Sequence, residues 1–349
     1  MKAPFVWFGG KRRVAPEVWA ALGDVPNYIE PFAGSLAVLL GRPHDMSNGT
    51  RRAETVNDAD GFLANFWRAL AHDPEAVAHW CDWPVNEVDL FARHLWLVNT
   101  GRSRLLEGME ADPDFYDAQV AGWWVWGVNA WIGAGWCSGD GPWVDTGDGI
   151  GKLPHLGDAG QGVNRQLPHL GNAGQGVNRK LPHLGNAGRA GYNNMEYRPN
   201  VLGYFEELAG RLRDVRVCCG DWSRVCTSGA MSYGSRVGVF LDPPYLGDVR
   251  TADLYAVDDH TIAHAVRDWC LEHGDDPRLR IVLAGYRAEH DDLMPDTWRR
   301  HYYSASAAYS TTESAARQDG NHANRANEVL WFSPHCVTPD RQGELWEAL

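Results

Sequence analysis

The chain has 349 residues, 44% of them hydrophobic, and a formal net charge of -13. This much apolar material can build a buried core, which excludes a largely disordered protein. No apolar run reaches the roughly 18 residues that a membrane-spanning helix needs, and the N-terminus lacks the apolar stretch of a signal peptide. The charge excludes a uniformly basic nucleic-acid binder, so contact with DNA requires a local positive patch. We expect a soluble, cytoplasmic protein.

The cysteine pattern bears on metals and disulfides. There are seven cysteines, an odd number, and no two have the two-residue spacing of a zinc site. We therefore expect reduced thiols, most of them in the core, and no metal.

Residues 1–70 alternate loop, strand and helix signals. A short strand ends at residues 28–30, a tight turn covers 32–35, a helix starts at 36–40, and a second strand covers 55–58. Apolar residues at helical spacing then predict an amphipathic helix with one buried face: Phe62, Leu63, Phe66, Trp67 and Leu70. This order of elements is typical of a nucleotide-binding sheet.

The composition changes in residues 71–195. A predicted helix around residues 91–97 is followed by a dense tryptophan run between 123 and 136, which we expect to be mainly core. Three 14-residue repeats then occupy residues 153–190. Their regularly placed Gly and Pro exclude a continuous helix, which leaves a small β-ribbon or a loop.

The α/β pattern returns in residues 196–349. Apolar runs predict buried strands at 216–219, 238–241 and 280–284, with helices at 201–213 and 259–272. Two late strands, near 300–309 and 327–333, predict a terminal antiparallel hairpin. We therefore expect an α/β fold in which residues 1–70 and 196–349 build one catalytic domain, interrupted by residues 71–195.

The first chemical motif follows the apolar run 238–241 and reads Asp242, Pro243, Pro244 and Tyr245. Ligands of open α/β sheets bind at the carboxyl ends of strands, where Asp242 would lie. The Asp242 carboxylate and the Pro243 carbonyl can accept both hydrogens of an exocyclic amino group, which aims its lone pair at an electrophilic methyl. Prolines leave nearby carbonyls available as acceptors, and Tyr245 offers a face for stacking on an extruded base. The alternative is an ordinary turn with a capping aspartate.

Two further motifs indicate a cofactor. Gly34 lies in the turn after the first strand and lets backbone approach a ligand, while Glu30 and Asp58 end the first two strands. Carboxylates there suit an amine-bearing cofactor and ribose hydroxyls rather than a phosphate. Near the N-terminus, Gly10 and Lys11 suggest a loop in which the lysine contacts a carboxylate. The alternative is a generic turn, which can contain the same residues.

The order of these motifs resembles the Dam-type DNA adenine methyltransferases. Residues 126–133 resemble the family's Asn-containing segment before its DNA-recognition hairpin, and residues 324–331 resemble its closing strand. The resemblance implies a Rossmann-like sheet that binds S-adenosylmethionine, with the target-recognition region inserted between the motifs. It assigns cofactor binding to Trp7, Gly10, Lys11, Glu30, Phe32, Gly34 and Asp58, and the target base to Asp242, Pro243 and Tyr245. The family usually has a further glycine where this chain has Leu36, so we expect that position to bear on cofactor affinity.

The local positive patch is expected in residues 150–200, which carry six basic and two acidic residues. We interpret this segment as a phosphate-contacting ribbon, with base readout from neighbouring polar side chains. The candidate DNA-binding residues are Asn129, Lys152, Arg165, Arg179 and Lys180. A repeated surface loop without base contacts is the alternative. Farther upstream, Arg93, Arg102 and Arg104 are candidates for DNA backbone contact or belong to a solvated helix face.

The predicted function is site-specific transfer of a methyl group from S-adenosylmethionine to the N6 amino group of adenine in double-stranded DNA, with base flipping. Alternatives are a methyltransferase acting on RNA or on protein glutamine, and a catalytically inactive DNA-binding relative. The sequence leaves open whether a restriction endonuclease accompanies the protein.

Overall fold

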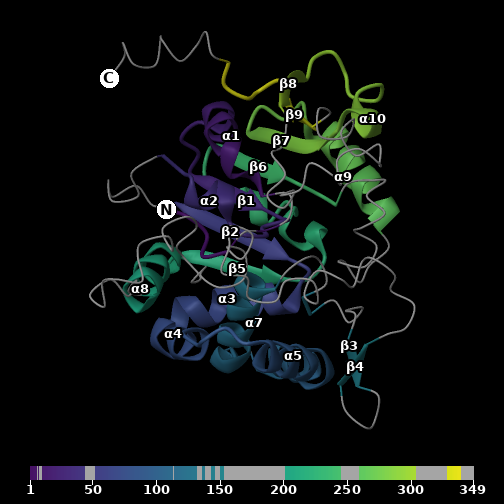
Figure 1. Cartoon of the computed structure of the whole chain (residues 1–349). Helices are drawn as coiled ribbons and strands as arrows, with labels where there is room; N and C mark the ends of the chain where they lie inside the picture. The colour runs from purple at the N-terminus through teal and green to yellow at the C-terminus, as the bar shows by residue number, and fades with distance from the viewer. Residues whose placement is uncertain are drawn as a thin grey trace, which may run out of the picture.

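The computed structural model describes residues 1–5, 7, 10–43, 52–112, 114–131, 136–137, 201–244, 262–303 and 328–338, and the backbone alone of 143–145, 150–152 and 259–261. A seven-stranded sheet lies at the centre (Figure 1). Its two faces carry two separate apolar cores. Among these residues, no helix has both the length and the apolarity needed to cross a membrane.

The sheet has the strand order β5-β2-β1-β6-β7-β9-β8. Its strands are β1 (Asn27–Glu30), β2 (Ala53–Asp58), β5 (Val215–Cys219), β6 (Val237–Leu241), β7 (Leu279–Tyr286), β8 (Arg299–Tyr303) and β9 (Glu328–Phe332). The first five in spatial order are parallel, and β9 is antiparallel to both β7 and β8. This confirms the predicted α/β class with an antiparallel end.

The order of strands places a switch point between β1 and β6. From β1 the chain continues to β2 on one side, whereas β6 lies on the other side. Open α/β sheets bind ligands outside the carboxyl ends of the strands at such a point, because the following loops diverge there. A ligand-binding site is therefore expected at the residues that follow β1 and β6.

Helices cover both faces of the sheet. They are α1 (Ala15–Leu22), α2 (Ala37–Leu40), α3 (Gly61–His72), α4 (Pro74–Cys81), α5 (Glu87–Trp96), α6 (Arg102–Ala111), α7 (Ala118–Ala130), α8 (Val201–Leu212), α9 (Asp259–His273) and α10 (Arg287–His290). Asp60 caps α3 by accepting from the Phe62 N–H at 2.8 Å. All five apolar residues predicted for the buried face of α3 are buried, which confirms its orientation.

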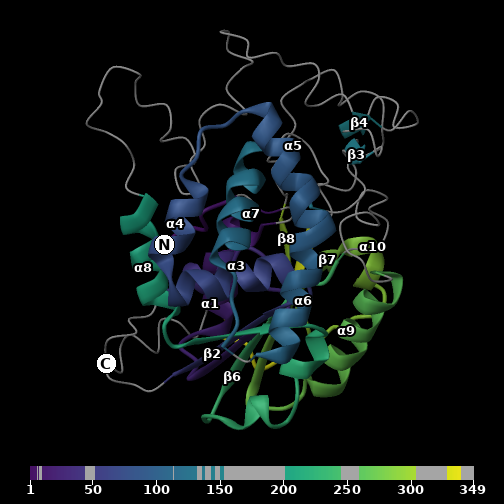
Figure 2. The same ribbon diagram turned by 90° about the horizontal axis from the view of Figure 1, so that it is seen from below.

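The helices between residues 74 and 130 form one layer that packs against the sheet domain (Figure 2). Helix α4 contacts α7 and α8, and α7 contacts α3. Trp124, Trp126 and Trp131 are buried there, so the tryptophan run is core, as predicted. A short hairpin follows, made of β3 (Trp143–Asp145) and β4 (Ile150–Lys152). The predicted 14-residue repeats lie outside the described residues.

The position of Arg93 differs from both sequence interpretations. Its guanidinium lies over the rings of Trp83, Trp123 and Trp126, with 4.4 Å to the centroid of the last. The side chain is buried, and loss of hydration lowers the pKa of Arg93. Cation–π contacts with three rings compensate part of this loss of water. Arg93 therefore contributes to the core and does not offer its charge to DNA.

Two other expectations need correction or refinement. The predicted buried strand at 216–219 is the edge strand β5, whose residues are half-buried, and Arg216 is exposed. All seven cysteines are free thiols, and five of them are buried, as expected for core thiols.

Candidate active site

The loops at the carboxyl ends of β1, β2 and β5 are joined by backbone and amide hydrogen bonds. The Ala33 N–H donates to the Asn57 carbonyl at 2.9 Å. The Asn57 side-chain amide donates to the carbonyls of Pro31 at 3.0 Å and Gly220 at 2.9 Å. Sequence reasoning placed Asn57 in a strand but missed this role. Asn57 thus holds three loops in register at the edge where a ligand would bind.

Gly34 is required in the turn after β1 for two reasons. Its φ of +46° lies in the left-handed region, which disfavours side chains, and an added Cβ would stand 2.7 Å from Cδ1 of Trp7. The Gly34 N–H donates to Asp58 Oδ2 at 2.9 Å, and its carbonyl accepts from Trp67 Nε1 at 3.1 Å. The structure therefore brings together Trp7, Gly34 and Asp58, three of the predicted cofactor residues.

Leu36 lies directly behind this turn. It adopts φ 55° and ψ 26°, left-handed values at the start of α2 where a glycine would be favoured. Its side chain is fully buried in the core. The cost of this residue is therefore backbone strain, and its side chain points into the protein.

The two carboxylates that end β1 and β2 differ in surroundings. Asp58 is half-buried, and its Oδ1 accepts from the Asp60 N–H at 3.0 Å. Burial raises the pKa of Asp58 to about 6, against the effect of the N–H groups of Asp60 and Gly34. It thus orders the Gly34 turn and keeps a polar group at the ligand-binding edge.

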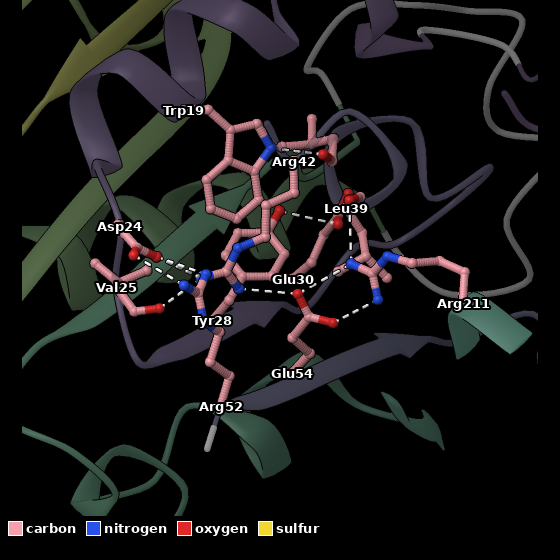
Figure 3. A network of polar contacts seen from close by, with 11 residues as sticks. Trp19, Asp24, Val25, Tyr28, Glu30, Leu39, Arg42, Arg52, Glu54 and Arg211 are labelled. Carbon is pink, nitrogen blue, oxygen red and sulfur yellow. Dashed lines mark hydrogen bonds and ion pairs between the residues drawn. The ribbon is translucent and has the colours of Figure 1, made fainter. Parts of the chain in front are cut away.

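Glu30 is directed into the protein (Figure 3). Its Oε2 accepts from the Tyr28 hydroxyl at 2.9 Å, and the backbone N–H of Leu39 also donates to it. Burial raises the pKa of Glu30 to about 8, the largest of several effects, and the negative charge of Asp242 adds to it. The predicted cofactor residue Glu30 therefore supports the base of the site through Tyr28 and the start of α2.

Two residues at the end of β5 were missed by sequence reasoning. The Trp222 ring is stacked near Phe32, with centroids 6.1 Å apart and planes at 27°. Asp221, directly before Trp222, is exposed and accepts from the Ser223 N–H at 2.9 Å. An acid and an aromatic residue directly after a strand, at the same edge as Asp58, is the signal that could have identified them.

Asp242 follows β6 immediately and is paired with Lys11. The Lys11 Nζ lies 2.9 Å from Asp242 Oδ1, and the two side chains are 5% and 19% exposed. Lys11 begins the short helix η1 (Lys11–Arg13), which follows a turn closed by a Gly10 N–H to Trp7 carbonyl hydrogen bond of 3.1 Å. The structure thus joins a predicted cofactor residue to the predicted catalytic residue. Pro243 is buried next to them.

The comparisons with known proteins bear on this geometry. Residues 7–85 match the family model of the D12 class N6 adenine-specific DNA methyltransferases. The match confirms the predicted family. The matched range includes every predicted cofactor residue from Trp7 to Asp58. The curated proteins gave no match.

Methyltransferases of this kind generally use S-adenosylmethionine, and the groups at the carboxyl edge suit that molecule. Asp58 offers a carboxylate for hydroxyl donors, while the half-buried Phe32, backed by Trp222, offers an aromatic face for a purine ring. These groups fit ribose, an amino group and adenine better than they fit a phosphate, because a phosphate prefers cations and free N–H groups.

The structure gives less support to the residues that were predicted to bind DNA. Asn129 is half-buried, and its amide donates to the carbonyls of Val125 at 2.8 Å and Pro4 at 3.3 Å, which ties α7 to the N-terminal segment. Arg102 donates to the Cys137 carbonyl at 2.5 Å, and Arg104 pairs with Asp117 at 2.8 Å. Lys152 is described only by its backbone in β4. Four predicted residues lie outside the described residues: Arg165, Arg179, Lys180 and Tyr245.

Proposed function

We propose that this methyltransferase transfers the methyl group of S-adenosylmethionine to the N6 amino group of an adenine that is flipped out of double-stranded DNA at a specific site. The observation that carries the proposal is the position of Asp242. It follows β6 at the switch point, next to the Gly34 turn of β1, and a buried lysine holds its carboxylate at 2.9 Å. The family match over residues 7–85 supports adenine as the target.

The chemistry proposed for the target base rests on acceptors. The adenine amino group is a poor nucleophile because its lone pair is delocalised into the ring. The Asp242 carboxylate and the Pro243 carbonyl would accept its two hydrogens, which directs the lone pair outward and stabilises the positive charge that develops on nitrogen. S-adenosylmethionine supplies the electrophilic methyl group. As the methyl carbon bonds to nitrogen, its bond to the sulfonium sulfur would break and leave a neutral thioether. The amino group would lose one hydrogen as a proton, for which the Asp242 carboxylate is the adjacent acceptor.

The remaining site residues are proposed to position the two substrates. Asp58 would accept from ribose hydroxyls, and Phe32 with Trp222 would flank the cofactor's adenine ring. Trp7 and Gly10 would shape the Gly34 turn that approaches the cofactor, and Glu30 would support this turn from inside the protein. Pro244 would hold the loop after Asp242 rigid, and Tyr245 would stack on the flipped base. Flipping is needed because the amino group inside a duplex is not accessible to a buried site.

DNA recognition is proposed for the segment between α7 and α8. Lys152, Arg165, Arg179 and Lys180 would contact phosphates, which adds local positive charge to a chain of net charge -13. Asn129 would act by anchoring the start of this segment to the N-terminal segment, given its bond to Pro4. Deletion of residues 153–180 should weaken DNA binding and make it less dependent on salt; unchanged affinity and sequence preference would reject this role.

The decisive experiment follows a tritiated methyl group from S-adenosylmethionine into DNA, RNA or protein. We expect label in double-stranded DNA, recovered as N6-methyladenine after digestion. Asp242→Ala should lower the rate by about a thousandfold or more, since an acceptor used in the transition state is lost, and should leave cofactor binding in place. Label in RNA or protein alone, or full activity of Asp242→Ala, would contradict the proposal.

A further inference from the structure

Arg102 joins two parts of the molecule that lie far apart in the sequence. Its guanidinium donates to the Cys137 carbonyl at 2.5 Å, and its Cζ lies 5.7 Å from the ring centroid of Phe62 at the start of α3. A cation within about 6 Å of an aromatic face is attracted to it. This half-buried side chain therefore holds the segment after α7 against the helix that follows β2.

Cys137 is held in a strained conformation. Its φ of +59° lies in the left-handed region, which a residue other than glycine occupies only where its surroundings fix it. The side chain is buried, and the Cys137 N–H donates to His94 Nδ1 at 3.3 Å. His94 can accept this bond because it is neutral, since burial lowers the pKa of His94 to about 4. Both backbone polar groups of Cys137 are thus fixed, the N–H by α5 and the carbonyl by α6.

The helix that carries Arg102 changes its geometry directly before this residue. A π-helical turn, η2 (Leu97–Gly101), lies between α5 and α6 and is closed by a hydrogen bond from the Arg102 N–H to the Leu97 carbonyl. Gly101 is packed there against the Trp96 ring, whose Cζ3 would stand 3.2 Å from an added Cβ. Single π-helical turns are rare and occur frequently at functional sites. A second irregular element therefore accompanies the strained residue that Arg102 contacts.

The contact of Arg102 with α3 leads to the carboxyl edge of the sheet. Phe62 donates its N–H to Asp60 Oδ1 at 2.8 Å, and Asp60 donates its N–H to Asp58 Oδ1 at 3.0 Å. Asp58 also accepts from the Gly34 N–H at 2.9 Å. A continuous series of contacts therefore runs from the Gly34 turn through the start of α3 to Arg102.

We propose that Arg102 is a positioning residue for methyl transfer, which couples the cofactor site at Asp58 to the DNA-recognition segment after Cys137, so that each substrate strengthens the binding of the other. The inference rests on the proposed function, since it needs S-adenosylmethionine at Asp58 and DNA at the segment between α7 and α8. The hairpin of β3 and β4 begins this segment, and β3 contacts α5. Arg102 acts here through other residues and lies outside the range that the family model matches.

The physical reason is that these contacts must be ordered before either substrate binds with full affinity. Ribose hydroxyls on Asp58 would fix the turn at Asp60, and with it the first turn of α3 on which Arg102 rests. Arg102 would then hold the Cys137 carbonyl in place, so DNA would bind with a smaller loss of conformational entropy. Thermodynamic linkage requires DNA to strengthen cofactor binding by the same factor.

The test measures DNA affinity with and without a cofactor analogue. The probe is a fluorescent duplex that carries a site methylated by the wild-type enzyme. It is titrated in the absence and presence of saturating S-adenosylhomocysteine, which keeps the ribose but has no methyl group to transfer. In the wild-type enzyme we expect the analogue to strengthen DNA binding about tenfold. In Arg102→Met this gain should fall below about twofold, while the affinity for the analogue alone and Tm stay close to wild type.

Two further variants make this measurement specific to Arg102. Arg104→Met removes the same charge from the same helix, but Arg104 is 55% exposed and pairs with Asp117, so the gain should remain about tenfold. Arg102→Lys keeps a cation that can donate to the Cys137 carbonyl, and it should recover part of the gain. At saturating S-adenosylmethionine, Arg102→Met should raise the KM for DNA about tenfold and leave kcat within about threefold.

A full gain in Arg102→Met would overturn the inference, as would a wild-type enzyme whose DNA affinity does not respond to the analogue. Equal weakening of DNA binding with and without the analogue, together with a smaller salt dependence, would show that Arg102 contacts a phosphate instead. In each of these cases, methylation of adenine by the wild-type enzyme leaves the proposed function standing. A wild-type enzyme that does not methylate adenine would refute the proposed function and this inference with it.

Discussion

Two groups of charged and titratable side chains share one face of the sheet and are built in opposite ways. The Glu54 network (Asp24, Arg42, Arg52, Glu54 and Arg211) lies at the start of β2 (Figure 3), whereas the Lys11 cluster (Lys11, Glu30, Asp242 and Glu328) lies at the carboxyl edge. In the Glu54 network, Arg42 donates to Glu54 at 2.8 Å and Arg211 donates to both oxygens at 2.6 and 3.0 Å.

The difference lies in how completely the charges are compensated. Arg42 also donates to the Val25 carbonyl at 2.6 Å and lies 4.9 Å from the Trp19 ring centroid, so the buried guanidinium has several partners. In the Lys11 cluster, Lys11 pairs with Asp242, while burial raises the pKa of both Glu30 and Glu328. A compensated network stabilises the fold, whereas buried carboxyls with raised pKa values beside an ion pair are suited to handling a proton.

The largest effect on stability is expected from Glu54→Gln. Glu54 is 3% exposed and joins α8 to the sheet through Arg211. Its loss removes the buried anion that Arg42 and Arg211 share, which should lower the free energy of unfolding by about 3–5 kcal/mol, measured by urea denaturation. Asp276→Asn, in an exposed pair with Arg278, is the control and should cost less than about 1 kcal/mol. Equal losses in the two variants would show that the Glu54 network is not stabilising.

Glu30→Gln tests the point where the two groups meet, since Tyr28 lies between Glu30 and the Glu54 network. Glu30 keeps its proton up to about pH 8 in the folded protein, whereas the unfolded chain releases it near the ordinary value of 4.5. The free energy of unfolding should therefore fall as pH rises through this window, by roughly 1 kcal/mol per pH unit.

The Glu30→Gln variant should lack this part of the decline. Urea unfolding of both proteins at about pH 5 and about pH 8 measures it, because the wild-type loss over this interval must exceed that of the variant. Parallel losses would mean that Glu30 is ionised in the folded protein.

A smaller effect is expected at Leu36, where apolar packing rather than charge is tested. Leu36→Gly loses a buried side chain but relieves about 1 kcal/mol of left-handed strain, for a net loss of roughly 2 kcal/mol. Leu36→Ala keeps the strain and should be less stable than Leu36→Gly, the reverse of the usual order. Chemical denaturation gives the order, and cofactor affinity should be unchanged in both variants. An alanine variant more stable than the glycine variant would contradict the assigned backbone strain.

Much of the sheet could be predicted because its signals are local. The apolar run before Asp242 predicts β6, and the spacing of Phe62, Phe66 and Trp67 predicts the buried face of α3. The carboxyl ends of parallel strands then bring Gly34, Asp58 and Asp242 to one edge without further information. Sequence reasoning therefore predicted that these residues meet at one edge of the sheet, and their role as a site stays a prediction.

The pairing of charges could not be predicted, because it depends on contacts between distant segments. Lys11 was assigned to the cofactor, and its partner Asp242 follows a strand much later in the chain. Arg93 has the spacing of a surface residue, yet three tryptophans from a loop and from α7 enclose it. Glu328 gave no local signal, since its surroundings arise from the antiparallel order of β7, β9 and β8.

The central claim is that the Lys11 cluster serves chemistry and the Glu54 network serves stability. The most direct test measures both kcat for DNA methylation and the free energy of unfolding in Lys11→Met and in Arg211→Met. Lys11→Met should lower kcat about a hundredfold. It should cost only about 1 kcal/mol of stability, because Asp242 is 19% exposed and can be hydrated when Lys11 is lost. Arg211→Met should lower stability by about 3 kcal/mol and leave the kcat of the folded enzyme within about twofold. The opposite assignment, or proportional losses of rate and stability in both variants, would contradict the account.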